Sequence, residues 1–135
     1  MRVGDDGQNL VKTLLGINEV DKSMIFAGNL PEGSKVRLMK ANFDKIINGS
    51  SVAATNALQD TAQQLPELSI LISCVGRKLI LQERTYEEVK AARKVLGPDT
   101  VITGFYSYGE ISPLGKLNNC ELHNQTMTIT TFTEI

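Results

Sequence analysis

The chain has 135 residues, which fits one domain that can bury a core without disulfides or a metal. Its 14 basic and 15 acidic residues give a formal net charge of −1, so no general field attracts nucleic acid or an anionic membrane. Its apolar stretches are far shorter than the roughly 20 residues of a membrane span, and no signal peptide is evident. The sequence therefore predicts a cytoplasmic protein without membrane insertion or nucleic-acid binding.

Residues 1–9 are polar and predict a flexible lead-in, and residues 10–135 predict a single domain. Short apolar or alternating runs before residue 41 indicate a small antiparallel meander. Its expected strands are residues 10–17, 24–27 and 35–40.

Helical periodicity begins after Asn42, which has the side chain of an N-cap. Pro66 ends this helix, because the residue before a proline avoids the α region. The glycine and serines at 49–51 interrupt the apolar face and leave open whether the helix is split. The residues expected on that face are Phe43, Ile47, Ala54, Leu58, Ala62 and Leu65.

Residues 68–75 are apolar on both faces, which is typical of a central, covered strand. Residues 85–88 (TYEE) have the spacing of a capping box at the start of a second helix. Gly97 and Pro98 end that helix. Its expected buried residues are Tyr86, Val89, Ala92 and Leu96.

A strand begins at residues 100–103 and runs into 104–111, and alternating β-branched residues predict a last strand at 126–132. The order of elements predicts an α+β fold, with one mixed, mainly antiparallel sheet and two helices packed on one face.

Few residues suggest catalysis or metal binding. No phosphate-binding glycine loop or nucleophile elbow is present, and one histidine with two cysteines is too few for a metal site, so no cofactor or metal is expected. Cys74 and His123 are the one possible nucleophile pair, which leaves a Cys-dependent hydrolase as an alternative to a small apolar Cys74 at a strand end.

Arg77 follows the covered strand, where a guanidinium can bind a ligand carboxylate or form an internal ion pair with Glu110. Tyr106 and Tyr108 share one strand face with Gly104, whose missing side chain makes room for a helix or a ligand. Phe105 is expected to point under the helices. His123 and Asn124 precede the last strand, in a position more typical of loop capping than of catalysis.

Three segments in order resemble the C-terminal part of FIST sensory proteins. They are residues 72–77 (ISCVGR), 104–111 (GFYSYGEI) and 122–128 (LHNQTMT), and residues 15–19 and 31–38 also look like that family.

The resemblance implies a bacterial or archaeal signal-transduction domain, not an enzyme, that binds a small ligand, amino acids among the candidates, and relays its state to other modules. It also implies an upstream FIST domain, so Met1 is expected to begin a fragment of a longer chain. The alternative is a docking half that packs on that upstream domain or forms a homodimer. The predicted ligand-binding residues are Cys74, Arg77, Tyr106, Tyr108, Glu110, His123 and Asn124.

Overall fold

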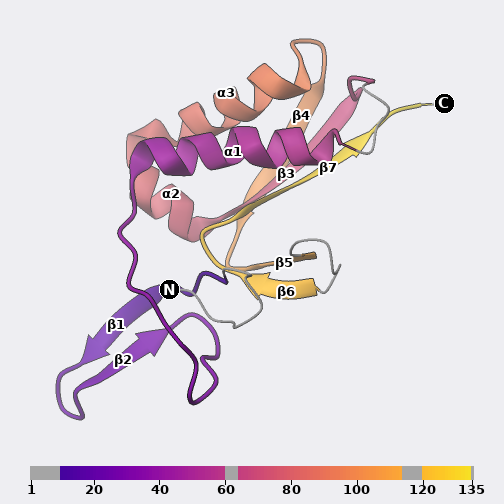
Figure 1. Cartoon of the computed structure of the whole chain (residues 1–135). Coiled ribbons are helices and arrows are strands. Elements are labelled where there is room, and N and C mark those ends of the chain that lie inside the picture. The colour runs from indigo at the N-terminus through magenta and orange to yellow at the C-terminus, as the bar shows by residue number, and fades with distance from the viewer. Residues whose placement is uncertain (1–9, 60–63, 114–119, 135) are drawn as a thin grey trace.

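The computed structural model describes residues 10–59, 64–113 and 120–134. Its centre is a three-stranded sheet in the order β4-β3-β7, formed by Val101–Ser107, Leu68–Cys74 and Met127–Phe132. β3 pairs with β4 in parallel and with β7 antiparallel. The predicted central strand is thus confirmed as β3, but the described helices cover it on one face only (Figure 1), where Ser69, Leu71 and Ser73 are buried.

Two helices cover one face of this sheet (Figure 1). They are α1, Phe43–Ala57, and α3, Thr85–Leu96. Their small buried residues, Ala54 and Ala92, let them approach the sheet, where they pack with Leu96, Leu71 and Met127 to form the core. The short helix α2, Val75–Leu81, and the 3₁₀ turn Gln82–Arg84 link β3 to α3.

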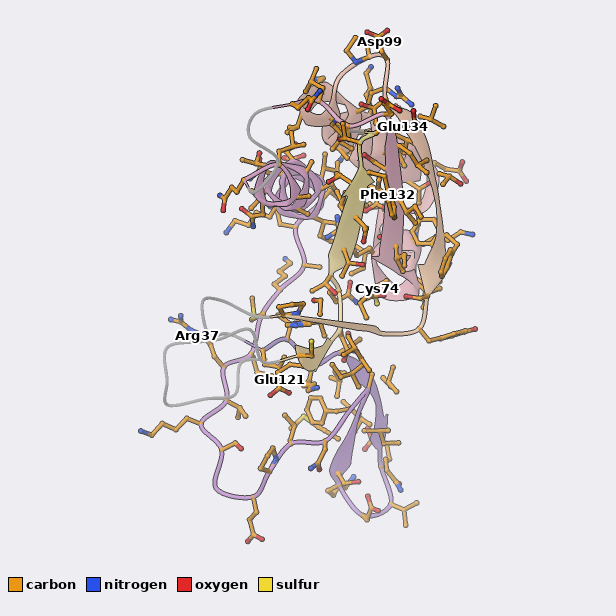
Figure 2. The ribbon with its side chains drawn as sticks, turned by 90° about the vertical axis from the view of Figure 1, so that its right-hand side faces the viewer. Arg37, Cys74, Asp99, Glu121, Phe132 and Glu134 are labelled. Carbon is orange, nitrogen blue, oxygen red and sulfur yellow. The ribbon has the colours of Figure 1, made fainter. Side chains whose placement is uncertain are left out.

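The remaining strands form two hairpins (Figure 1). β1, Leu14–Asn18, pairs with β2, Ser23–Phe26, and β5, Glu110–Pro113, pairs with β6, Cys120–His123. Figure 2 places Cys74 at the end of the central sheet that faces the hairpins and Asp99 at the opposite end. The α+β prediction is confirmed, although the described strands form three sheets instead of one.

Several local predictions are confirmed. Asn42 caps α1, because its side-chain oxygen accepts from the Lys45 amide at 3.1 Å. α1 runs through residues 49–51 without a break, but the predicted helix end at Pro66 is wrong, because α1 ends at Ala57. Gly97 ends α3 with a positive φ of 103°. The expected lead-in at residues 1–9 and the helix-face residue Ala62 lie outside the described residues.

Other local predictions are wrong. Residues 35–40 form no strand, because alternation alone supplies no pairing partner. Thr85 does not cap α3, since the preceding 3₁₀ turn makes Arg84 the N-cap and turns Glu88 inward. Four residues that were expected on buried helix faces are exposed, namely Phe43, Leu65, Tyr86 and Val89. Leu65 lies beyond the end of α1, and the other three lie on helix sides turned away from the core, whereas Ala92 and Leu96 are buried as expected.

Phe105 does not pack under the helices. Its neighbour Tyr106 reaches a side chain of α3, and alternation along the strand then directs Phe105 to the other face of the sheet. Phe105 is 61% exposed there. That face also carries Val101 and Phe132, both exposed, so none of the described helices lies over this mainly apolar face (Figure 1).

Candidate functional site

Arg77 lies in α2, one turn beyond the end of β3, and is only 4% exposed. Its Nε donates to the Glu88 carboxylate at 2.9 Å. Its Nη2 donates to the Ser50 hydroxyl at 2.7 Å and the Ile46 carbonyl at 2.8 Å, and its Nη1 donates to the Gln125 carbonyl at 3.4 Å. All three guanidinium nitrogens therefore have protein acceptors, which ties α1, α3 and the β6–β7 turn together.

Glu88 is the carboxylate that pairs with Arg77. It lies on α3 four and eight residues before Ala92 and Leu96, which places it on the buried face of the helix, and it is 0% exposed. Besides Arg77, it accepts hydrogen bonds from the Tyr106 hydroxyl at 2.6 Å and from Ser73 at 3.3 Å. This many donors is what a fully buried carboxylate requires, because an unpaired buried charge is very costly.

Tyr106 joins this ion pair to the central sheet. Partial burial raises the pKa of the Tyr106 hydroxyl above its ordinary value, and the hydrogen bond to the Glu88 carboxylate raises it further. The ammonium of Lys78, on α2, lies 5.3 Å from the centre of the Tyr106 ring, within range of a cation–π contact. Tyr106 thus remains a neutral hydrogen-bond donor well beyond neutral pH.

A cleft of about 350 Å³ opens between α3 and the edge strand β4, beside this buried pair. Tyr106, Glu88 and Ser73 contribute polar side chains to its lining, and Gly104 forms part of the wall contributed by β4. The volume falls in the range of small-molecule sites. The remaining lining residues are Leu71, Val89, Ile102, Thr103, Phe105 and Met127.

Gly104 allows β4 to approach β3 closely. A Cβ atom at this position would overlap the backbone carbonyl oxygen of Leu71, its partner in the parallel register. The missing side chain therefore makes room for the neighbouring strand β3 instead of the predicted helix or ligand, although Gly104 also lines the cleft.

The expected ion pair between Arg77 and Glu110 is wrong, because Arg77 pairs with Glu88. Glu110 begins β5 and is buried, but its carboxylate accepts hydrogen bonds from the hydroxyls of Ser107 and Thr126. The short turn after β4 directs Glu110 toward these near neighbours instead of toward α2.

His123 and Asn124 lie away from the cleft lining and hold the joint between the hairpins. Nε2 of His123 donates to the Ser112 carbonyl at 3.2 Å, which joins β6 to β5. The Asn124 side chain accepts from the Thr13 amide at 3.1 Å, and Lys12 donates to the Leu122 carbonyl at 2.9 Å. These buried polar residues anchor the start of β1.

The other two predicted site residues do not line the cleft either. Tyr108 is 91% exposed beyond the end of β4. Cys74 is buried at the end of β3, and its amide donates to the Thr126 carbonyl. Among the described residues, no hydrogen bond or ion pair joins Cys74 to His123, whose ring is bonded to Ser112.

Sequence reasoning missed Glu88 and Ser50, which complete the environment of Arg77. The spacing of Glu88, Ala92 and Leu96 was a usable signal, because it places a carboxylate on the apolar face of a helix. The capping-box interpretation obscured it. Ser50 interrupts the apolar pattern of α1 in the sequence, but a small polar residue on a buried helix face can hydrogen-bond a buried charge, as Ser50 does with Arg77.

Replacing Tyr106 with Phe tests the assignment of its hydroxyl. In the folded protein, the tyrosinate absorbance of wild type minus that of Tyr106→Phe is expected to rise only above the ordinary tyrosine pKa of about 10. Because the folded-state pKa is raised, the stability that this group contributes is complete below pH about 10 and is lost as the pH rises through the raised value. A difference signal that titrates at or below pH 10 would contradict the assignment.

Within the described ranges, no helix has the length and apolar character needed to cross a membrane. In the same residues, no group of three or more His, Cys, Asp or Glu side chains is placed to hold a metal ion.

The fold and the cleft define a small α+β domain in which a ligand-sized apolar cleft borders a buried ion pair. Comparison with protein-family models matches residues 1–113 to the FIST C domain, so the chain belongs to the FIST C domain family. This family is a sensory domain family and not a known enzyme family, which is consistent with a sensory or signalling role. The comparisons with curated proteins and with solved structures found no match.

Proposed function

We propose that this chain is a cytoplasmic sensory domain that binds a small ligand in the cleft between α3 and β4 and relays the bound state to other modules. The observation that carries the proposal is the cleft itself, of about 350 Å³, with Glu88 and Tyr106 in its wall. A mainly apolar cleft with a few convergent polar groups is the usual form of a small-molecule site.

The proposed site differs from the one expected from the sequence. Tyr106 keeps its role as a ligand contact, and the fully buried Glu88 behind it accepts the hydrogen bond of the Tyr106 hydroxyl. Arg77 acts indirectly, since its guanidinium holds Glu88 in place instead of meeting the ligand. Tyr108, Glu110, His123, Asn124 and Cys74 have no place in the cleft lining and are not proposed as ligand contacts.

The contacts of Arg77 supply a route for the relay. A ligand that moves Tyr106 or Glu88 changes the acceptor of Arg77, which also donates to α1 and to the Gln125 carbonyl. The Gln125 side chain in turn donates to the Thr13 hydroxyl at 3.3 Å, at the base of the β1–β2 hairpin. The hairpin is therefore the proposed output element.

A ligand screen by thermal shift and calorimetry tests the binding proposal. We expect at least one compound of a broad panel that includes amino acids to stabilise the protein, by about 2.7 kcal/mol at 100 times its Kd. Val89→Trp, which places a large ring in the cleft, is expected to abolish this stabilisation. The matched control is Val52→Trp on α1, where the side chain is half exposed and does not line the cleft. Equal binding by the two variants would refute the cleft as the site.

A docking function is the second candidate, because two apolar surfaces are exposed. One is the open face of the sheet around Val101 and Phe132, and the other is the β1–β2 hairpin. The hairpin residues concerned are Leu15, Ile17, Val20, Met24 and Ile25. Contiguous exposed apolar surface is typical of protein interfaces. Here the partner is an upstream FIST domain or a second copy of this chain.

Light scattering distinguishes docking from an isolated sensor. We expect a dimer mass, or association with a separately expressed FIST domain, that is lost in Leu15→Ser/Ile17→Ser and retained in the surface control Val52→Ser. A monomer at all concentrations that also fails to bind the FIST domain would rule out docking.

A further inference from the structure

The charges at the cleft restrict what can bind there. Among the described residues that line the cleft, Glu88 is the only charged one, and it is already paired with Arg77 at 2.9 Å. Because each charge of the pair has the other as its partner, the pair presents neither a free anion nor a free cation to a ligand. The site is electrically neutral as a unit.

A charged ligand would therefore be poorly accommodated. A ligand carboxylate would lie close to the Glu88 carboxylate, while all three nitrogens of Arg77 donate elsewhere. A ligand ammonium would have to displace Arg77 from Glu88 or remain unpaired beside apolar side chains. Either arrangement buries a charge without a partner, which costs several kcal/mol. A free amino acid combines both problems.

The cleft does offer hydrogen-bond acceptors. The Tyr106 hydroxyl and the Ser73 hydroxyl both donate to Glu88, so each keeps oxygen lone pairs available for a donor. The rest of the wall is largely apolar, with Leu71, Val89 and Ile102 prominent in it. This lining matches a molecule with an apolar body and one N–H or O–H group.

We infer that the ligand of this cleft is an uncharged, mainly apolar molecule that carries one hydrogen-bond donor. The inference rests on the proposed function and narrows its ligand class away from free amino acids. The ammonium of Lys78 also bears on the ligand class, because it lies over the Tyr106 ring, but Lys78 is exposed and does not line the cleft.

Two series of probes with a constant apolar body and different charge test the inference by calorimetry at neutral pH. The first is indole, tryptamine, indole-3-acetate and tryptophan, and the second is 3-methylbutan-1-ol, 3-methylbutylamine, 3-methylbutanoate and leucine. In at least one series we expect the neutral member to bind at least about tenfold more tightly than any charged member, a difference of about 1.4 kcal/mol.

Three variants assign the site in the same experiment. Val89→Trp and Tyr106→Phe are expected to weaken binding of the neutral probe, and Lys78→Gln is expected to leave it unchanged. Thermal melts of each variant without ligand confirm that it is folded.

The outcomes separate the two proposals. If a charged member binds the cleft as tightly as the neutral one, or if Lys78→Gln removes the binding, the inference on ligand class fails while the sensor function stands. If no member of either series and no compound of the broad panel binds, both fail.

Discussion

Arg77→Met is expected to lower the free energy of unfolding by about 3–5 kcal/mol, because it leaves the Glu88 carboxylate fully buried without its counter-ion. The substitution preserves much of the volume of the side chain, so the loss reports mainly on the missing charge and hydrogen bonds. It also removes the donors to Ser50 and to the Gln125 carbonyl, which link α1 to the β6–β7 turn. Denaturant unfolding measures the change.

Two further variants make this expectation specific. The double variant Arg77→Met/Glu88→Met removes both charges and is expected to regain most of the lost stability. The matched control is Arg84→Met. Arg84 pairs with Glu87, the residue before Glu88 on α3, but this ion pair lies at the surface. A solvent-screened pair contributes little, so this control is expected to change stability far less. A loss for Arg77→Met no larger than that for Arg84→Met would refute the account of the buried pair.

Gly104→Ala is expected to cost on the order of 4 kcal/mol or to prevent folding, which is exceptional for the addition of one methyl group. The added Cβ would overlap the Leu71 carbonyl, and backbone in the middle of the central sheet cannot give way as a flexible side chain does. β3 and β4 would have to separate, which would also open the cleft.

The matched control is Gly16→Ala in β1, where an added Cβ has no atom within 4 Å. Thermal and denaturant unfolding of the two variants are compared directly. Gly16→Ala is expected to change stability by about 0.5 kcal/mol or less. If Gly104→Ala is as stable as Gly16→Ala, then β3 and β4 are not packed as closely as described.

Local sequence patterns were enough to predict many of the helices and strands. The N-cap at Asn42, the glycine stop at Gly97 and the two-sided apolar strand β3 each depend on neighbouring residues, and each is confirmed. The C-terminal strand β7 was equally clear, because Thr and Ile alternate along it.

The failures concern which elements meet in space. Arg77 was recognised as a buried or ligand-binding cation, but its partner depends on how α2 turns after β3, and no spacing encodes that turn. The sequence indicated Glu110 as the carboxylate partner of Arg77. The actual partner, Glu88, lies in a segment whose spacing resembles a capping box. The cleft itself arises from the position of α3 over β4, a packing result that a linear pattern does not contain.

The sequence also could not predict which face of the sheet each aromatic side chain of β4 occupies. Tyr106 and Phe105 alternate on β4, so one of them must face the helices, but local pattern gives no reason to prefer the polar ring. In the structure Tyr106 faces the helices, because there its hydroxyl donates a hydrogen bond to Glu88. The orientation of β4 therefore follows from the buried ion pair of Arg77 and Glu88.

Residue-resolved NMR titration with the best-binding probe tests the central claim most directly. We expect amide shift changes to concentrate at Glu88, Val89 and Gly104, with a weaker response at Gln125 and Thr13 that disappears in Arg77→Met/Glu88→Met. Changes confined to the β1–β2 hairpin or to the β5–β6 hairpin, with none at Glu88, Val89 and Gly104, would contradict a ligand site between α3 and β4.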